Sequence, residues 1–432
     1  MDKKDFIFLM ENLNISNDYL DTIAFQTGFI KRNRSIKTHN FLSTICIESV
    51  NGIASSNDIA AHMEGDSNVS RQAVWKKMNS SLELYLKRIL ALIITNKINN
   101  SLGEKVTIDY KRILVQDSTI IRLPVKLFSA FSGVANAQSK VCNARVQCVY
   151  EFIAEQFVYF SIDSYSKNDL SVAPLLDVQP GDLVLRDRGY LMADEIQRHL
   201  DHKAQCVFRY RFNMILCDPI TENVIDLFSD LKKVKSLDRI VMLNNKSKTL
   251  VRILAHPVSK EIADRRRRKT KLESKNTPSE KLLESLSWSI YITTIMDRNI
   301  GYEYIYKAYS LRWRIEIIFK CWKSNLAFDQ IHNVSKIQLN ILLLARFITI
   351  IIIQIVFKSC RIIVKKVFDK SLSLLKFTKY VLNNSINLTF IIEEINNNKD
   401  SNLNNIKYLA RFCSYDKRER KNFQQCFDQA FS

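Results

Sequence analysis

The sequence lacks the features of a secreted or zinc-stabilised protein. Its nine cysteines form no CxxC pair, and none is spaced with the six histidines in a pattern typical of a metal site. A zinc site or a disulfide framework is therefore not expected, and a reducing cytoplasm suits the composition. The first five residues are mostly charged, and the apolar run after them, FIFLM, is too short for a secretory signal.

Long apolar runs are also scarce. One stretch, 341–357, reads ILLLARFITIIIIQIVF and has the composition of a membrane span. It is slightly short for a span, and Arg346 near its middle would cost about 2.5–3.5 kcal/mol on insertion into a bilayer. We therefore expect a buried helix that covers a sheet, and no membrane partner.

Acidic residues are outnumbered. Lys and Arg total 64 against 44 Asp and Glu, which gives a net charge of +20. This excess indicates a polyanionic partner, with nucleic acid ahead of a membrane or an acidic protein. Abundant Asn, Ile and Lys suggest an AT-rich genome, which explains part of the lysine excess but not the arginine clusters. The 432 residues, 47% of them apolar, suffice for two or three domains with their own cores.

Two short helices are predicted near the N-terminus, at 57–63 and 70–78, joined by the segment EGDSNV. Ser70 is a suitable N-cap for the second helix. That helix would turn Arg71 and Lys76 outwards, which suits the reading helix of a helix-turn-helix motif. An ordinary helical hairpin is the alternative, because the connecting turn is longer than usual.

From residue 112 the pattern changes to short β-rich runs. RILVQDSTIIRLP, KVCNARVQCVYEF and QFVYFSIDS predict three neighbouring antiparallel strands. A helical segment, the run DLVLRDRGY, a further helix and the strand QCVFRYRF follow, so the pattern alone indicates an α/β fold. Asp117 ends ILVQD and Asp187 ends LVLRD, and we expect each carboxylate to stand where a buried strand emerges.

A polar stripe is predicted on the segment 309–323, YSLRWRIEIIFKCWK. At helical pitch Tyr309, Arg312, Glu316 and Lys323 project from one side of a single helix, beside an apolar stripe that would face the core. The alternative is a surface helix with an Arg312–Glu316 ion pair, worth about 0.3–0.5 kcal/mol.

This spacing matches, without a gap, the Y-(2)-R-(3)-E-(6)-K signature of the insertion-sequence family four transposases, a cut-and-paste group of the DDE class. The chain resembles that family. The resemblance implies a ribonuclease H-like catalytic core, a mixed five-stranded sheet with flanking helices, interrupted by a largely β insertion and joined to helical N- and C-terminal regions. It also implies that Asp117, Asp187 and Glu316 are the catalytic carboxylates and hold Mg²⁺, for which Mn²⁺ can substitute.

The resemblance further implies contacts with DNA. Tyr309, Arg312 and Lys323 would bind phosphates at the element's end, Arg as a planar fork and Lys as a point charge. Arg188, in DRGY, is a fourth candidate, and a local structural ion pair is the alternative for it. The run RRRRKTK in the insertion is either a solvated charge run or a further phosphate contact.

Trp288 lies in the apolar run LESLSWSIYITT, 28 residues before Glu316. A tryptophan in such a run is ordinarily part of the core. Members of the family that cleave through a DNA hairpin carry a tryptophan at about this place, which stacks on a flipped base. We prefer this second interpretation, because unstacking a base costs energy that an aromatic platform returns in part.

These inferences predict a bacterial insertion-sequence transposase that acts on terminal repeats and target DNA, as a homodimer, in the cytoplasm at the nucleoid. The alternatives are a metal-dependent nuclease without strand transfer and a domesticated DNA-binding protein. The predicted regions are a helical DNA-binding domain at 1–105, the first part of the catalytic core at 106–203, the β-rich insertion at 204–298, the second part of the core with the signature helix at 299–360, and a helical region at 361–432, for which the resemblance implies a role in dimerisation.

Overall fold

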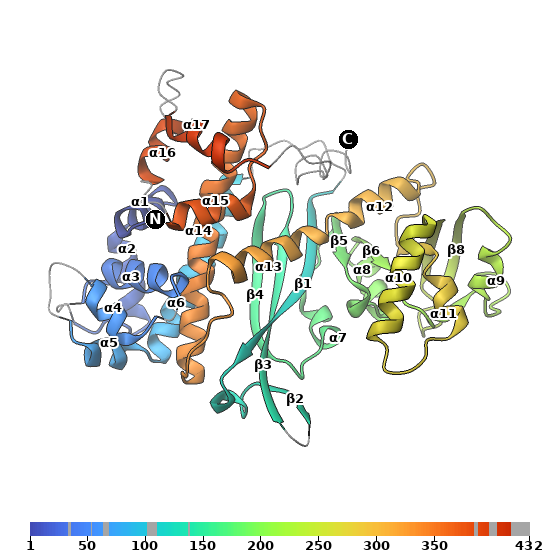
Figure 1. Cartoon of the computed structure of the whole chain (residues 1–432), viewed down its shortest axis with the longest axis horizontal. Coiled ribbons are helices and arrows are strands. Elements are labelled where there is room, and N and C mark those ends of the chain that lie inside the picture. The colour runs from blue at the N-terminus through green and yellow to red at the C-terminus, as the bar shows by residue number, and fades with distance from the viewer. Residues whose placement is uncertain are drawn as a thin grey trace.

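The computed structural model describes residues 1–32, 36–52, 54–63, 69–101, 110–136, 139–383, 388–396 and 404–415. The protein has a mixed α/β fold, with one large sheet and many helices. Helices from both ends of the chain lie at one end of the long axis, the sheet occupies the middle, and the predicted insertion forms the other end (Figure 1).

The N-terminal region is helical, as predicted. Serine side chains cap its short helices: Ser55 begins one, and Ser70 accepts a hydrogen bond from the backbone N–H of Ala73 at the start of the next. The two short helices of the sequence analysis are thus confirmed, while most of the turn between them lies outside the described residues. The helices are α1 (Lys3–Asn12), α2 (Asn17–Gln26), α3 (Thr38–Val50), α4 (Ser56–His62), α5 (Arg71–Lys77) and α6 (Ser80–Ser101).

Among the described residues, ten strands form a single sheet. They are β1 (Arg112–Leu123), β2 (Ser132–Asn136), β3 (Ser139–Glu151), β4 (Gln156–Ser164), β5 (Asp182–Arg186), β6 (Gln205–Arg209), β7 (Leu216–Cys217), β8 (Leu237–Leu243), β9 (Leu250–Pro257) and β10 (Trp288–Thr293). The three antiparallel strands predicted from the sequence are confirmed, because β3 lies between β1 and β4 and pairs antiparallel with both. Strands β5 and β6 continue from β1 in parallel.

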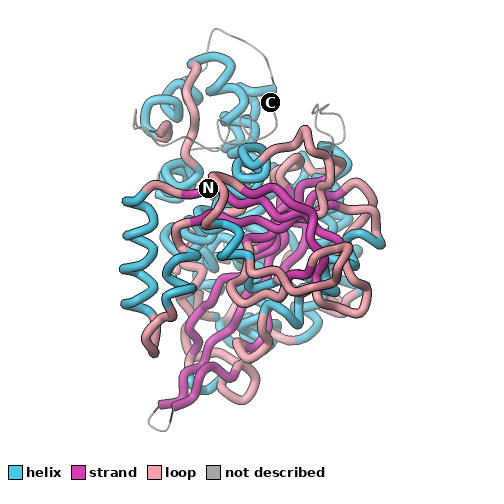
Figure 2. The backbone as a smooth tube through the Cα atoms, turned by 90° about the vertical axis from the view of Figure 1, so that its right-hand side faces the viewer, coloured by secondary structure: helices cyan, strands magenta, loops and turns pink. Residues whose placement is uncertain are grey.

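The sheet does not end at the predicted insertion. β10 pairs antiparallel with β6, and β9, β8 and β7 follow in antiparallel order, so the segment 204–298 extends the central sheet. Figure 2 shows the strands as one twisted row, from which the β2–β3 hairpin projects. Short helices connect the strands: η1 (Val125–Leu127), α7 (Asp169–Val172), η2 (Ala173–Leu175), η3 (Arg188–Tyr190), α8 (Ala193–Asp201), α9 (Leu227–Leu231), α10 (Lys260–Glu273) and α11 (Glu280–Ser285).

The two faces of the sheet contribute to different cores. Ile113 and Val115 of β1 belong to a first core, shared with helices from both ends of the chain, while Leu114 between them faces a second core shared with the insertion. This alternation follows from the two-residue period of a strand. The remaining helices are α12 (Tyr302–Ser310), α13 (Trp313–Asn325), α14 (Lys336–Phe368), α15 (Leu374–Asn383), α16 (Leu388–Asn396) and α17 (Asn404–Phe412).

The apolar run 341–357 lies in the 33-residue helix α14. This is the one helix among the described residues that is long and apolar enough to cross a membrane, and 89% of its most apolar window is buried inside the protein. The expectation of a buried helix is confirmed. The helix packs mainly against α3 and α6, and its contact with the sheet is mainly with the edge strand β4, so it is apolar all round because other elements surround it. Figure 1 shows α14 between the N-terminal helices and the sheet.

Arg346 explains how a charge is accommodated in this helix. Its side chain is 1% exposed and donates to four backbone carbonyls, those of Ser49, Phe328, Gly52 and Gln330, at 2.7, 3.1, 3.2 and 2.9 Å. Burial lowers the pKa of Arg346 to about 10, which still leaves it charged at neutral pH. The guanidinium therefore ties α14 to the end of α3 and to the turn after α13.

We predict that Arg346→Met lowers the free energy of unfolding by roughly 2–4 kcal/mol, because it leaves several buried carbonyls without a donor. Denaturant unfolding followed by circular dichroism measures this change. Lys366→Met, at an exposed position of the same helix, is the matched control and should change stability little. Equal stability of the two variants would show that the four hydrogen bonds do not hold the helices together.

Candidate active site

Pairing between two strands sets the positions of the aspartates. β1 and β5 are parallel, and their last paired residues are Gln116 and Arg186. Asp117 and Asp187 are the next residue on each chain, so they leave the paired region side by side on one edge. Strand spacing would place their backbones about 5 Å apart.

The expectation that both aspartates end a strand holds for one of them. Asp187 follows β5 directly, but Asp117 lies in the middle of β1, opposite Cys148 of β3. β1 continues because its antiparallel pairing with β3 extends to Leu123, beyond the end of β5. Asp117 therefore stands where the parallel neighbour stops rather than where its own strand stops.

The signature segment is not a single helix. α12 ends at Ser310 and α13 begins at Trp313. Across the joint the backbone N–H of Arg312 bonds to the carbonyl of Tyr309, and that of Ile315 to the carbonyl of Arg312, so these bonds span three residues instead of four. The joint is a tight turn of 3₁₀ type, in which successive residues rotate further than in an α-helix. The single-helix expectation is therefore wrong at this point.

Arg312 lies at that joint and forms hydrogen bonds with two of the carboxylates. Its Nη1 donates to Asp117 Oδ2 at 2.9 Å, and its Nη2 donates to Glu316 Oε1 at 3.0 Å. Tyr309 completes the group, because its hydroxyl donates to Asp187 Oδ1 at 3.5 Å. The three predicted carboxylates thus come together from β1, from the end of β5 and from α13.

Burial and mutual repulsion govern the charges of this group. Burial raises the pKa of Asp117 to about 6, against the opposing effect of Arg312, and the nearby Glu316 and Asp187 add to the rise. Burial by itself would lower the pKa of Arg312, but Tyr309 and the carboxylates around it raise the value above normal. Burial likewise raises the pKa of Tyr309. Arg312 therefore remains a cation, and its presence favours the ionised form of Asp117.

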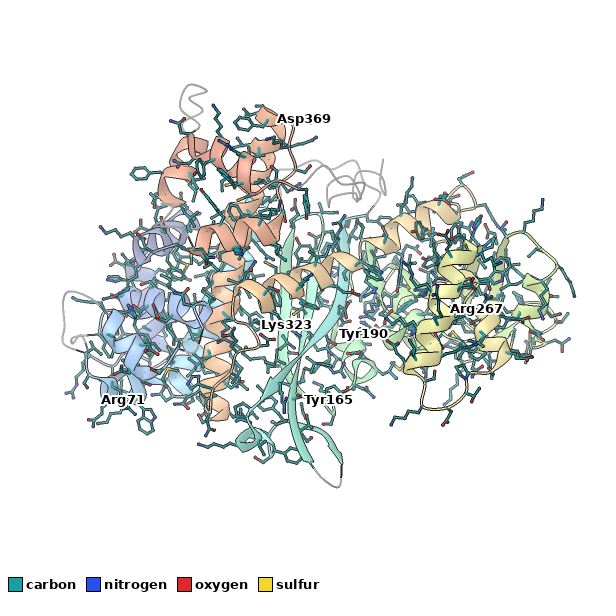
Figure 3. The ribbon with its side chains drawn as sticks, viewed as in Figure 1. Arg71, Tyr165, Tyr190, Arg267, Lys323 and Asp369 are labelled. Atoms are coloured by element: carbon teal, nitrogen blue, oxygen red, sulfur yellow. The ribbon has the colours of Figure 1, made fainter. Side chains whose placement is uncertain are left out.

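Lys323 lies further along α13. Its Nζ donates to the backbone carbonyl of Ile120, in the part of β1 beyond Asp117, at 2.8 Å. The side chain thus stays beside the strand that carries the first aspartate. Figure 3 shows Lys323 and Tyr190 in the middle of the molecule, with Arg71 and Arg267 towards its two ends.

The other predicted DNA contacts lie at different distances from the carboxylates. Arg188 directly follows Asp187 and is exposed, and its side chain makes no hydrogen bond or ion pair in the described part of the chain. The local ion pair considered for it is therefore not observed there. Arg71 and Lys76 are exposed on α5, at the far end of the molecule. Between them Trp75 is 62% exposed, a feature that the sequence analysis did not single out.

Trp288 begins β10 and is half-buried against the second core. Tyr291, three residues further along β10, faces the opposite side of the sheet, where its ring lies 5.2 Å from that of Tyr309. The side chains of Trp288 and Tyr309 are therefore on different faces. This packing supports the core interpretation of Trp288 over the stacking platform that the sequence analysis preferred.

The arginine run of the insertion divides into two groups on α10. Arg266 donates to the backbone carbonyl of Trp288 and to Ser289, and Arg267 donates to Ser287 and to a backbone carbonyl, so both are structural. Other basic residues of the run are exposed: Arg265, Arg268, Lys269 and Lys271. Only this second group is available to a phosphate.

A fourth carboxylate, Asp169, was not identified from the sequence. Its Oδ1 accepts hydrogen bonds from Ser118, Arg145 and Gln147 at 3.1, 3.0 and 2.9 Å. Ser118 also donates its backbone N–H to Asp117 at 2.8 Å. Asp169 is therefore linked to the predicted trio through a single residue, Ser118. Its only local signal is the cap-like pair Asn168–Asp169 at the start of α7, which does not reveal these partners.

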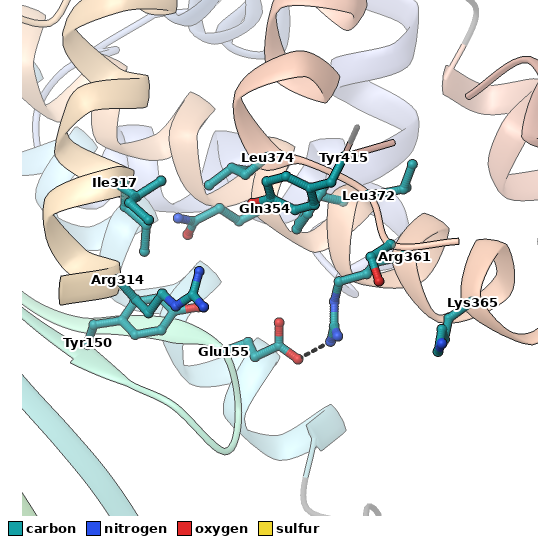
Figure 4. A pocket seen from close by; sticks show the side chains of 13 residues that line it. Tyr150, Glu155, Arg314, Ile317, Gln354, Arg361, Lys365, Leu372, Leu374 and Tyr415 are labelled. Atoms are coloured by element: carbon teal, nitrogen blue, oxygen red, sulfur yellow. Dashed lines mark hydrogen bonds and ion pairs between the residues drawn. The ribbon is translucent and has the colours of Figure 1, made fainter. Parts of the chain in front are cut away.

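A mainly apolar pocket lies elsewhere. Arg314, Ile317 and Ile318 of α13 line it, and an ion pair between Arg361 and Glu155 borders it (Figure 4). At helical pitch these three α13 residues project to the side opposite Glu316 and Lys323. The pocket is therefore separate from the carboxylates.

The donor set of the trio suits a hard divalent cation, because all three side chains present carboxylate oxygens. Within the described residues, however, no three His, Cys, Asp or Glu side chains form a preformed metal cluster. Arg312 supplies the positive charge between Asp117 and Glu316 in this arrangement. The chemistry of the ligands thus fits Mg²⁺, and in this arrangement a guanidinium lies between two of them.

Comparison with known proteins agrees with this geometry. Residues 110–352 match the family model described as "Transposase DDE domain", which covers more than half of the chain and contains all three carboxylates. The chain therefore belongs to the DDE transposases, enzymes that cleave DNA and transfer strands.

Individual relatives narrow the assignment. The transposase for insertion sequence element IS231E of Bacillus thuringiensis subsp. finitimus is 25% identical over 385 residues, 82% of this chain and 80% of that protein. The transposase for IS1151 of Clostridium perfringens is 23% identical over 412 residues, 86% and 85% of the two chains. Together with the signature spacing, these relatives identify a member of insertion-sequence family four.

The solved structure of the piggyBac transposase synaptic complex with hairpin DNA is a more distant neighbour. It aligns with a TM-score of 0.41 and 8% identity, over 94% of this chain and 84% of that one. The functional assignment does not depend on this likeness.

We predict that Trp288→Ala lowers the free energy of unfolding by about 2–4 kcal/mol, since the ring packs against the second core. All DNA-processing steps should fall together with the melting temperature, and Trp288→Phe should restore most of both. Thermal unfolding and a gel assay that separates nicked from hairpin product measure the two effects. A stable Trp288→Ala protein that nicks normally and loses only hairpin product would restore the platform interpretation.

Proposed function

We propose that this protein is the transposase of a bacterial insertion sequence, which cuts the element's ends by metal-assisted phosphodiester hydrolysis and joins the freed 3′ hydroxyls to target DNA. The observation that carries the proposal is the convergence of Asp117, Asp187 and Glu316 from three separate elements around Arg312 and Tyr309. Such a group of carboxylates has no evident structural purpose, because like charges at this range repel.

The strand order supports a ribonuclease H-like core within this proposal. The strands β4, β3 and β1 are antiparallel, and β5 and β6 then follow β1 in parallel, which gives a mixed five-stranded sheet. We assign these strands, with α12 and α13, to the catalytic core, and the strands from β7 to β10 to the insertion. This assignment moves β6 (Gln205–Arg209) from the insertion predicted at 204–298 into the core. The regions at 1–105 and 361–432 are assigned to DNA binding and dimerisation, and each includes residues outside the described ones.

The carboxylates would act as ligands. Two Mg²⁺ ions, or Mn²⁺ in their place, would activate a water molecule and stabilise the leaving 3′ oxygen when bound. Asp117 and Asp187 stand at one edge of the sheet, and Glu316 faces them from α13. The same arrangement would serve strand transfer, because only the nucleophile changes from water to a 3′ hydroxyl.

The signature cations would then change partners. Arg312 and Lys323 bind groups of the protein in this structure, a pair of carboxylates and a backbone carbonyl. The Arg312 fork has the planar geometry to bind a phosphate bidentately when it is not paired with the carboxylates. Tyr309 would position the same DNA strand through its hydroxyl.

A DNA hairpin intermediate is supported by the family resemblance alone. The packing of Trp288 against the second core does not support this residue as the one that stacks on a flipped base. A nuclease without strand transfer uses the same carboxylates and remains the alternative function. A domesticated DNA-binding protein is disfavoured, since such a protein has no need of the complete trio. We place the enzyme in the cytoplasm at the nucleoid, as a homodimer on DNA and without a membrane partner.

We expect Asp117→Asn, Asp187→Asn and Glu316→Gln each to abolish Mg²⁺-dependent cleavage of a DNA end while leaving binding of that end largely intact. The physical reason is that each change removes an anionic ligand but keeps the side-chain shape. Purified protein, Mg²⁺ and a labelled terminal repeat provide the assay, with a target plasmid added to score joined product.

Asp201→Asn and Glu303→Gln, at exposed positions outside the site, are the matched controls and should cut normally. Near-normal cleavage by any one of the three site variants would refute the metal assignment. Cleavage without any joined product by the unaltered protein would favour the nuclease alternative.

The second prediction of this function concerns recognition of the element's ends by α5. Lys76 borders a hollow of about 600 Å³, which is also lined by Lys31, Arg32 and Lys77. We expect the double variant Arg71→Ala/Lys76→Ala to bind the terminal repeat more weakly, with a salt dependence shallower by about 2 because two phosphate contacts are lost.

Binding of full-length protein to terminal-repeat and scrambled duplexes over a salt series measures this. Lys235→Ala/Lys246→Ala removes the same charge from exposed positions of the insertion and serves as the control. If the two double variants prefer the terminal repeat equally and show equal salt slopes, α5 does not read the ends.

A further inference from the structure

A basic hollow opens directly beside Asp187. It has a volume of about 440 Å³, and its walls include Arg145, Arg188 and Arg211 together with Asp169. These residues come from β3, from the turn after β5, from the segment after β6 and from α7. The hollow thus adjoins the carboxylates at the end of β5, and its Arg145 lies on β3, the strand that pairs with β1.

The charges in the hollow do not cancel. Arg145 is neutralised by its ion pair with Asp169, 3.0 Å from Nη1 to Oδ1. Arg188 and Arg211 are exposed, and across the described parts of the chain their side chains have no hydrogen bond or ion pair. Three guanidiniums and one carboxylate leave a formal charge of plus two, which favours an anionic ligand.

The hollow shares a wall with the catalytic carboxylates. Arg188 is the residue after Asp187, and Ser118 bridges the two sites. The backbone N–H of Ser118 donates to Asp117 at 2.8 Å, and its hydroxyl donates to Asp169 at 3.1 Å. A DNA strand whose reacting phosphate lies at the trio would therefore carry its neighbouring phosphates past the hollow.

The turn that carries Arg188 is firmly held. Tyr190 is 1% exposed and donates its hydroxyl to Gln147 at 2.8 Å, and Gln147 in turn donates to Asp169 at 2.9 Å. A Cβ added at Gly189 would lie 3.4 Å from Asp169 Oδ2, so the backbone runs close to this carboxylate. Such anchoring fixes the direction in which Arg188 leaves the backbone, as a preorganised phosphate site requires.

We propose that this hollow binds the phosphodiester backbone of DNA immediately beside the reacting phosphate, through Arg188 and Arg211. Arg145, held by Asp169, forms the inner wall. The proposal rests on the proposed function, because it supposes that DNA reacts at the trio. Two sources can supply this backbone: the element's own end with its flank, or the target DNA that arrives for strand transfer.

The test uses full-length protein with the double change Arg188→Gln/Arg211→Gln. The matched control is Lys235→Gln/Lys246→Gln, which removes two exposed positive charges from the insertion. Binding to duplex DNA is measured over a salt series. We expect the salt slope of the hollow variant to become shallower than that of the control by about 2, one unit for each phosphate contact.

Two reaction assays then separate the sources of the backbone. One follows cleavage of an uncut element end, and the other follows joining of a precut end to plasmid. Slower cleavage assigns the hollow to the element's DNA, whereas normal cleavage with reduced joining assigns it to the target. Either result, with the altered salt slope, supports the proposal.

The charge-retaining variant Arg188→Lys/Arg211→Lys should keep most of the salt slope, and melting temperatures should match that of the unaltered protein. The proposal is overturned if the hollow variant binds and reacts like the control. If the unaltered protein cuts no DNA at all, the proposed function fails, but the comparison of salt slopes still tests the hollow independently.

Discussion

The ion pairs of Arg312 are the interaction on which the site depends. Three carboxylates brought together at a half-buried edge repel one another, and burial already raises the pKa of Asp117 to about 6. A guanidinium between Asp117 and Glu316 lowers this repulsion and fixes both side chains at hydrogen-bonding distance. The strand register brings the aspartates to one edge, but without a cation among them the folded arrangement would favour a protonated acid. The protein thus supplies its own positive charge at the place where the proposed chemistry requires metal ions.

The break between α12 and α13 makes that bridge possible. In the tight turn the hydrogen bonds span three residues. The side chains of Tyr309 and Arg312 therefore point in directions, relative to each other, that a continuous α-helix would not give them. Tyr309 reaches Asp187, while Arg312 reaches Asp117 and Glu316. Periodicity alone describes these residues as one stripe on one helix. The stripe is a useful signal because it identifies the residues, but the joint determines which carboxylate each of them meets.

The sequence could predict what depends on local pattern. Strand periodicity gave the three antiparallel strands, Ser70 was correctly placed as a helix cap, and the signature spacing singled out the residues that now surround Asp117 and Asp187. It could not predict contacts between distant segments. Three examples depend on which elements pack together: the bonds from Arg346 to carbonyls at the end of α3 and after α13, the three donors that meet at Asp169, and the continuation of β1 beyond Asp117. The same limit applies to Trp288, whose face of the sheet is set by the alternation along β10.

The net charge of +20 does not show where DNA binds, because several arginines are bound inside the protein. Arg186 and Arg252 are fully buried and form ion pairs with Glu195 and Asp238, respectively. Arg346 donates hydrogen bonds to backbone carbonyls. A guanidinium with several donors can satisfy buried oxygens of distant segments, so it serves as a structural connector as well as a phosphate ligand. Arginines that are exposed and unbound therefore indicate the route of DNA better than the overall charge does. By this criterion the exposed cations beside Asp187 are more informative than the longer basic run on α10, half of whose arginines hold the insertion together.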